Sequence, residues 1–336
     1  MFHLRSKVVW QESAPHVLLL SKFKSAREDY SEGRLGGHDW EEWEEVLNES
    51  PRKAMKRFLK DGVLEQASLE GCLAYKFKVP ELKAMLKRHG LSMSGRKADL
   101  IDRLIEADPQ GMKKAVSGLS LLQCSEQGQE IVERYEAAER EKRVQLEQSL
   151  LNALQQHEFR KAVELRVSYE AEQIFPSGLG IDWQDYPFNE HDVGMIESIF
   201  TRKPRVMAHL SDEQLEPLRV GAGMIVLGWT PSQMKKWLPS DLDNGLHVSN
   251  WGAALMLHSH AHYLREMRQA RKFQNDGVFQ YEVSIETCND DYVCDACRRI
   301  ASRKYTVEVA PELPYEKCTS EDGCRCAVGV RPIVPD

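Results

Sequence analysis

The stretch Val79-Pro-Glu-Leu-Lys-Ala-Met-Leu-Lys-Arg-His-Gly-Leu-Ser-Met-Ser-Gly-Arg-Lys-Ala-Asp-Leu-Ile-Asp-Arg-Leu-Ile-Glu106 has the clearest helical pattern in the chain. Pro80 suits the first turn of a helix, where its missing N–H costs nothing, and Leu82 and Leu86 recur at the four-residue spacing of one helix face. Gly90 stands where a helix can stop, because glycine readily takes a left-handed conformation. The sequence therefore predicts a helix from about residue 79 to residue 89.

A second helix is predicted after a loop over residues 91–94. Ser94 is expected to cap it, because a serine hydroxyl accepts hydrogen bonds from the free N–H groups of a first turn. Asp108-Pro109 ends the helix, since proline removes a backbone donor. The helical spacing gives it one apolar face, formed by Leu100, Ile101, Leu104 and Ile105.

The charge of the chain is distributed unevenly around these two helices. Between Pro51 and Asp108 there are 13 Lys and Arg against 8 Asp and Glu, a balance of +5. The whole chain has 45 basic and 52 acidic residues and a net charge of −7, so the remainder has −12. A basic region on an acidic chain is typical of one local polyanion-binding module, and it argues against a wholly basic nucleic-acid binder.

Residues 75–108, about a tenth of the chain, resemble the SAP domain. The resemblance implies a helix, an extended loop and a second helix that together bind double-stranded DNA, often A/T-rich DNA. The matching positions are Val79, Glu81-Leu82-Lys83, Leu86, Gly90-Leu91, Ser94-Gly95, Lys97, Leu100 and Arg103-Leu104.

The candidate DNA contacts lie in and around the loop and the first turn of the second helix. Free N–H groups and the positive end of that helix can face a phosphate, and Gly95 lets the backbone approach closely. The alternative is that the basic residues are only the solvated face of a packing unit. A charge of about +5 predicts weak, salt-sensitive affinity, so another module or partner would add specificity. The candidate contacts are Lys76, Lys78, Lys83, Lys87, Ser94, Gly95, Arg96, Lys97 and Arg103.

The expected fold class is mainly α and multi-module: a SAP-like helix-loop-helix and a helical C-terminal domain that ends in a small zinc-bound α/β tail. The segment 126–174 reads as one long helix or a helical hairpin, and Pro176-Ser-Gly-Leu-Gly180 is the expected linker. Strands are predicted at 278–285 and 304–309, where apolar and polar residues alternate. The expected domains are 1–50, 51–110 with the SAP-like element, 111–175, 181–277 and 278–336.

The composition is that of an ordinary globular chain, with 42% hydrophobic residues and a mean hydropathy of −0.50. Its longest apolar runs, Val17–Leu20 and Val220–Trp229, are shorter than the roughly 20 residues that span a bilayer. The first residues do not have the pattern of a signal peptide. We therefore expect no membrane partner and a cytoplasmic, DNA- or nucleoid-associated protein.

Six of the eight cysteines lie in the last 49 residues, which predicts a local metal site in a reducing compartment. A C-x2-C pair followed by three further cysteines suits the four tetrahedral ligands of Zn²⁺. An all-cysteine set is typical of a closed structural site, so a catalytic zinc is not expected; disulfides are the alternative. Cys288 lies outside the motif and is the weakest candidate. The candidate ligands, one of them spare, are Cys294, Cys297, Cys318, Cys324 and Cys326.

The same tail resembles the C-terminal part of phage head-morphogenesis proteins. The likeness rests on the first cysteine pair, on Leu313-Pro314 and on Cys324-Arg-Cys326. The chain has Tyr315 to Cys318 where that pattern commonly carries a histidine before its Cys-Arg-Cys, so the two patterns differ there. The resemblance implies a phage or prophage structural or assembly role.

Two further clusters are candidates for chemistry. His258 and His262 would share a helix face, but Ser259 stands where a zinc protease has its glutamate, so a polar helix surface is the preferred interpretation. Acidic residues after the linker could hold Mg²⁺ in a nuclease, although solvated turns are commoner. These residues are Asp182, Asp185, Glu190, His191 and Asp192.

The sequence favours a non-enzymatic role over an enzymatic one. The leading hypothesis is a DNA-binding protein that positions a partner or complex on DNA. The alternatives are a phage-related structural or assembly protein, with a protein partner or self-assembly, and a metal-dependent nuclease.

Overall fold

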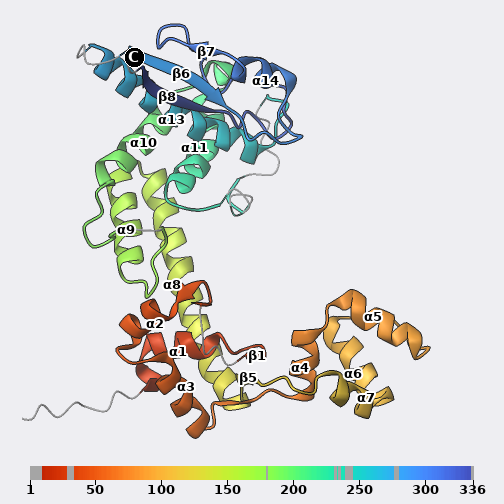
Figure 1. Cartoon of the computed structure of the whole chain (residues 1–336). Coiled ribbons are helices and arrows are strands. Elements are labelled where there is room, and N and C mark those ends of the chain that lie inside the picture. The colour runs from red at the N-terminus through yellow and green to blue at the C-terminus, as the bar shows by residue number, and fades with distance from the viewer. Residues whose placement is uncertain are drawn as a thin grey trace, which may run out of the picture. The chain divides into compact units, whose positions relative to one another are not determined.

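The chain forms two compact units, Met1–Arg143 and Val144–Asp336, and is mainly helical (Figure 1). The computed structural model describes residues 10–28, 34–178, 181–230, 233, 236–238, 245–275 and 280–333. The expected mainly helical fold is therefore confirmed, and each unit is described by itself below.

The first unit begins with three short helices that pack around large side chains. They are α1 (Ala14–Ser21), α2 (Trp40–Leu47) and α3 (Pro51–Lys60), with the 3-10 turn η1 (Trp10–Glu12) in front. Trp43 and Phe58 are fully buried, and the ring of Trp10 lies 4.8 Å from that of Phe58. Burial of such aromatic surface, more than helix propensity, holds helices of 8–10 residues together.

The first unit also contains short strands, some of which pair across distant parts of its sequence. An antiparallel sheet has the order β1-β5-β4, in which β5 (Leu121–Cys124) pairs with β1 (Arg27–Glu28) and with β4 (Leu64–Gln66). A small hairpin pairs β2 (Arg34–Leu35) with β3 (His38–Asp39). The residues between β4 and β5 therefore form a separate group of helices, and the chain re-enters the sheet at β5.

The helices between β4 and β5 are α4 (Leu69–Lys76), α5 (Val79–Arg88), α6 (Lys97–Ala107) and α7 (Pro109–Ala115), as Figure 1 shows. The two central helices lie where the sequence predicts them. Their apolar faces meet in one core with Leu73, Met112 and Val116 from the flanking helices. Four leucines at its centre have no exposed surface, namely Leu82, Leu86, Leu100 and Leu104.

The segment 126–174 is a helical hairpin, which was one of the two predicted forms. It consists of α8 (Glu126–Gln155) and α9 (Phe159–Ala171). His157 lies between them with a positive φ of 57°, a conformation that no regular helix contains, and this breaks the pattern.

The second unit has one large core beneath its helices. It is built mainly from α10 (Asn189–Thr201), α11 (Asp212–Val226) and α13 (Asn250–Asn275), which pack on one another. The expected linker at 176–180 lies within this unit. There the N–H of Ser177 donates to the carboxylate of Glu170 over 2.7 Å, and α9 packs on α10; residues 179 and 180 lie outside the described part.

An antiparallel sheet of order β7-β6-β8 lies on α13 and carries the cysteine-rich end. Its centre is β6 (Gln280–Glu286), flanked by β7 (Lys304–Tyr305) and β8 (Ala327–Ile333). The predicted strand at 278–285 is thus present from residue 280, and residues 278 and 279 are not among those described. The strand predicted at 304–309 is wrong beyond residue 305, where the chain turns; Thr306 accepts the N–H groups of Val309 and Ala310. Among the helices of the described residues, none contains an apolar stretch of the length that a bilayer would require.

Candidate functional site

The nine candidate DNA contacts lie on one continuous segment, from the end of α4 to the middle of α6. Most of their side chains are exposed, but Lys97 and Arg103 are half-buried. The structure therefore separates side chains that are available to a ligand from those that hold the module together.

The first turn of α6 is capped differently from the prediction. The N-cap residue is Arg96, whose N–H donates to the carboxylate of Asp99 over 2.8 Å. Ser94 is not the cap; its hydroxyl lies 2.9 Å from that of Ser92 within the loop. The helix starts two residues later than expected because the carboxylate of Asp99, in the first turn, accepts a hydrogen bond from the backbone N–H of Arg96. Arg96 keeps a side chain that is 91% exposed, with its Nε 3.9 Å from Asp99.

Two of the candidate lysines bind backbone carbonyl groups. Lys97 Nζ donates to the carbonyl of Ala74 in the last turn of α4, and Lys76 Nζ donates to that of Ala115, the last residue of α7, each over 2.5 Å. Cations at the C-terminal carbonyls of helices offset the negative end of the helix dipole. Lys76 and Lys97 therefore tie the ends of α4, α6 and α7 together and offset the negative helix ends there.

Arg103 also makes hydrogen bonds to backbone carbonyls within the module. Its guanidinium group donates to the carbonyls of Ser92 and Ser94, to the latter over 2.5 Å. Gly95 follows with a φ of +114°, and an added Cβ would lie 2.9 Å from the Asp99 carboxylate and 3.0 Å from the Arg103 guanidinium. The loop is thus a braced turn in which a side chain at position 95 would be strained.

The remaining cations are free to meet a polyanion. Within the described residues, no ion pair involves Lys83, Lys87 or Arg88, and all three are exposed. Lys113 and Lys114 are also exposed, in the last turn of α7. The sequence-based candidates for DNA contact do not include these two lysines, because the candidates end within the second helix. The neighbouring pair Lys113-Lys114 after Pro109 is the signal in the sequence that points to them.

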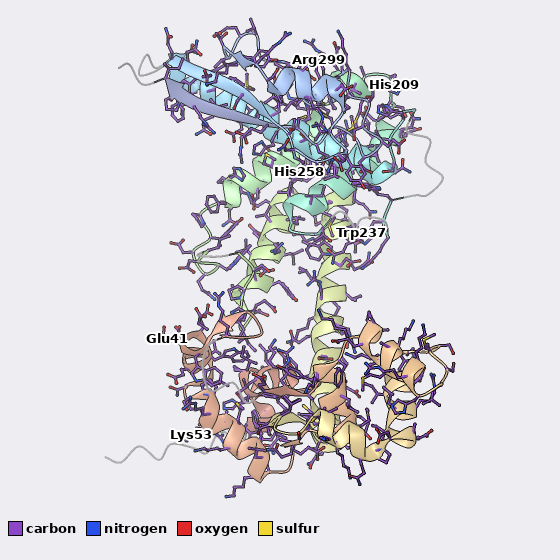
Figure 2. The ribbon with its side chains drawn as sticks, turned by 45° about the vertical axis from the view of Figure 1, so that its right-hand side comes forward. Glu41, Lys53, His209, Trp237, His258 and Arg299 are labelled. Carbon is purple, nitrogen blue, oxygen red and sulfur yellow. The ribbon has the colours of Figure 1, made fainter. Side chains whose placement is uncertain are left out.

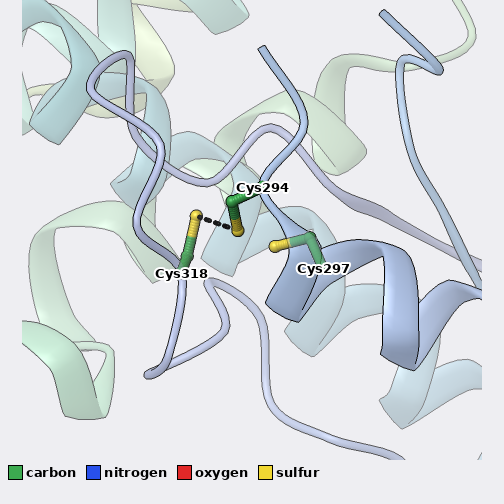
Figure 3. Close-up of side chains that lie close together, drawn as sticks. All are labelled: Cys294, Cys297 and Cys318. Carbon is green, nitrogen blue, oxygen red and sulfur yellow. Dashed lines mark hydrogen bonds between the residues drawn. The ribbon is translucent and has the colours of Figure 1, made fainter. Parts of the chain in front are cut away.

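The C-terminal cysteines come together as predicted. Cys294 is the N-cap of α14 (Asp295–Ala301), Cys297 lies in its first turn, and the others precede β8. The sulfur of Cys294 lies 3.8 Å from that of Cys318 (Figure 3), and the sulfur of Cys297 lies 4.0 Å from that of Cys324. Two groups of three ligand atoms, Cys294–Cys297–Cys318 and Cys297–Cys324–Cys326, could each hold a metal ion and share Cys297.

Backbone N–H groups point at these sulfurs. Thr319 donates to Cys294 over 3.4 Å, and Tyr315 donates to Cys324 over 3.3 Å. Burial opposes ionisation of Cys294, but the N–H groups of Thr319 and Cys297 and the neighbouring thiols outweigh it, and the pKa of Cys294 falls to about 7. Thiolates stabilised in this way are the form that binds metals.

Two of the sulfur–sulfur separations have the length of an edge of a zinc–thiolate tetrahedron. With zinc–sulfur bonds of about 2.3 Å, the edge of a sulfur tetrahedron is about 3.8 Å. The separations of 3.8 and 4.0 Å match this edge. Cys288 is exposed and its thiol lies 3.8 Å from the carbonyl of Arg325, so it stands outside the group.

Both histidines lie on α13 and are half-buried; Figure 2 labels His258. Burial, with added like charge from His262 and Arg265, lowers the pKa of His258 to about 4. His262 Nε2 lies 3.0 Å from the Arg265 guanidinium. Neither ring belongs to a group of three potential metal ligands within the described residues.

Three of the acidic residues after the expected linker, Asp182, Glu190 and Asp192, make contacts within the fold. Asp182 accepts the N–H groups of Gln184 and Asp185 in a turn, and Glu190 makes a two-bond pair with Arg160. Asp192 accepts the hydroxyl of Tyr186 over 2.8 Å. In the part of the chain that the structure describes, these carboxylates do not converge on a common cation position.

Comparison with known proteins identifies one family. The SAP domain matches residues 76–109, the segment of α5 and α6. No curated protein matches the chain, and no solved structure does. The SAP resemblance is therefore confirmed, and it points to association with nucleic acid. The similarity of the tail to phage head-morphogenesis proteins is not confirmed.

Proposed function

We propose that the protein binds double-stranded DNA through its SAP domain, with the phosphate backbone held by exposed cations around the braced loop. The observation that carries this proposal is that the cations of the module fall into two groups. Lys76, Lys97 and Arg103 hydrogen-bond to backbone carbonyls of the helix ends and of the loop, whereas the side chains of Lys83, Lys87 and Arg96 remain exposed.

The phosphate contacts extend over more than one helix. Lys78, Lys83 and Lys87 lie on or next to α5, and Arg96 lies at the start of α6. Lys113 and Lys114 in the last turn of α7 join them, since Lys76 ties that turn to the end of α4. Such contacts position DNA without reading its sequence, so a preference for A/T-rich DNA would arise from its shape and deformability.

The cysteine group is proposed to hold a structural Zn²⁺ ion with Cys294, Cys297, Cys318 and Cys324 as ligands. Two sulfur pairs in this set have the separation of a tetrahedral edge, and both Cys294 and Cys324 receive backbone N–H groups. Cys326 is then the spare thiol. A bound ion would tie the start of α14 to the segment before β8, and a closed set of four thiolates leaves no open position for a substrate.

This assignment predicts different results for two neighbouring cysteines. Cys326→Ser should keep one zinc per chain, whereas Cys324→Ser should lose it or bind it more weakly. Zinc content after gel filtration, together with cobalt substitution and its thiolate charge-transfer absorption, separates the two variants. Equal loss in both variants would contradict the assignment of Cys326 as spare.

The role that follows is non-enzymatic. The second unit has its own core and a cysteine group that could hold a metal ion, and we propose that it carries a protein partner or a further copy of the chain to DNA. The low charge of the SAP module suits this role, because weak, salt-sensitive binding needs a second contact for specificity.

Fluorescence anisotropy of the full chain with A/T-rich and G/C-rich duplexes tests the DNA proposal at two salt concentrations. Wild type should bind at low salt and lose affinity as salt rises. Lys83→Gln/Lys87→Gln/Arg96→Gln should bind more weakly, with a salt slope reduced by about 0.9 for each phosphate that is no longer neutralised.

The matched control is Lys53→Gln/Lys56→Gln/Lys60→Gln, which removes the same charge from α3 (Figure 2 shows Lys53). It should bind like wild type. No binding by wild type at low salt would contradict the proposal. Equal decreases in affinity for the two triple variants would show a general charge effect in place of a defined interface.

A further inference from the structure

The tip of the loop between α5 and α6 presents an apolar side chain. Met93 is 44% exposed, and both neighbours, Ser92 and Ser94, are exposed as well. A single exposed methionine is common on protein surfaces and by itself indicates nothing. What distinguishes this one is how firmly the backbone around it is held.

Three sets of contacts fix the loop on both sides of Met93. The guanidinium group of Arg103 donates to the carbonyls of Ser92 and Ser94, the residues before and after it. The two serine hydroxyls lie 2.9 Å apart, and the N–H of Ser94 lies 3.4 Å from the Ser92 hydroxyl. A planar guanidinium that spans two carbonyls leaves little freedom to the residue between them.

The charges around the tip are those of a DNA-binding surface. Arg96, three residues later, is 91% exposed, and Lys87 and Arg88 end the helix before the loop. Cations on both sides of the tip would draw a polyanion to it, so Met93 would meet whatever lies between two phosphates. In duplex DNA that surface consists of sugars and base edges.

We propose that Met93 acts as an apolar wedge that lies against sugars and base edges of the bound duplex and partly unstacks one base step. Methionine is among the side chains that proteins insert in this way, and a braced loop avoids the entropy cost of ordering it. Pyrimidine–purine steps such as TA unstack most readily, so the wedge would favour DNA that contains them. The inference rests on the proposed DNA binding and adds to it a source of sequence preference.

The wedge has a signature that separates it from the phosphate contacts. An apolar contact releases no counterions, so removing it lowers affinity without a change in the salt slope. Met93→Ala should weaken binding to TA-containing DNA about fivefold, the scale of a partly buried methionine side chain. Met93→Leu should restore most of the affinity, since leucine offers similar apolar surface.

Duplexes with 2-aminopurine beside a central TA step report unstacking directly, because the fluorescence of this base rises when stacking is disrupted. Saturating wild type should raise the fluorescence, and saturating Met93→Ala should not. Lys87→Gln is the matched control: it should lower affinity and the salt slope yet give the full rise at saturation. Circular dichroism melts check that the variants keep the fold.

The outcomes distinguish this inference from the proposed function. Wild-type binding without a rise in fluorescence would overturn the wedge and leave DNA binding standing. Met93→Ala with wild-type affinity, or with a lower salt slope, would also overturn it. No binding by wild type at low salt would overturn the proposed function and the wedge with it.

Discussion

The SAP module and the cysteine-rich end are two small structures that are held together in different ways. In the first, Leu82, Leu86, Leu100 and Leu104 bury all of their surface between short helices. In the second, a seven-residue helix and a two-residue strand lie beside thiols from residues 294 to 326 that gather in two groups able to hold a metal ion. The comparison contrasts a module built from local apolar spacing with an end for which we propose a few distant metal ligands, and the two should respond to different changes.

The largest expected effect is the removal of a shared thiol. Cys297→Ser replaces the residue that both cysteine groups have in common, so the end of the second unit should lose the proposed metal ion and unfold locally. Structural zinc contributes on the order of 10 kcal/mol of binding free energy in small domains, and part of it should be lost here. Zinc analysis and hydrogen exchange of residues 280–333 measure the effect, with exposed Cys288→Ser as the unaffected control.

A core substitution in the SAP module should act independently of metal. Leu100→Ala leaves a cavity among fully buried side chains and should lower the free energy of unfolding by about 3 kcal/mol. Chelator should not change the stability of residues 69–116, as followed by hydrogen exchange, in wild type or in the variant. A chelator effect on this module would contradict the distinction between the two structures.

Acid should weaken the second unit more than the SAP core. The pKa of His258 is lowered to about 4, so the folded chain keeps the ring neutral where the unfolded chain, with a pKa near 6.5, binds a proton. The stability is therefore fully present above pH 6.5 and is lost as the pH falls toward 4, by at most about 3 kcal/mol. Urea unfolding from pH 7 to pH 4 measures it, and His258→Gln should flatten the dependence.

The smallest effect is expected at the braced loop. Arg103→Lys keeps the charge but cannot span two carbonyls with one planar group, so the free energy of unfolding should fall by about 1 kcal/mol. DNA affinity should fall with it while the salt slope stays the same, because Arg103 makes no phosphate contact in this proposal. Thermal melts and anisotropy titrations check both, and a changed salt slope would instead identify Arg103 as a phosphate ligand.

Much of the SAP module could be predicted because its information is local. Leucine spacing, Pro80 and Gly90 determine two helices that the structure places within a residue or two of the prediction. The cap was assigned wrongly because Ser94 and Asp99 both offer oxygen to a helix start, and only the three-dimensional turn selects between them. The carbonyl contacts of Lys76, Lys97 and Arg103 involve residues that sequence spacing does not relate.

The cysteine-rich end was harder to predict in detail. The ligand candidates followed from residue type, but β8 was missed because Gly329 and Pro332 interrupt its alternation. Pairing with β6, which starts 47 residues earlier, overrides that weak local signal. The short β7 shows the reverse, since an alternating pattern there ends after two residues when the chain turns.

The helix α8 gives the chain a natural place to be divided. The boundary between the compact units falls at Arg143 and Val144, inside this one helix. Val132 is buried toward one end and Leu150 toward the other, whereas residues 140–145 are all exposed. A cut there would remove no core side chain from either unit, so we expect each half to fold as a separate building block that can be produced or fused to another protein.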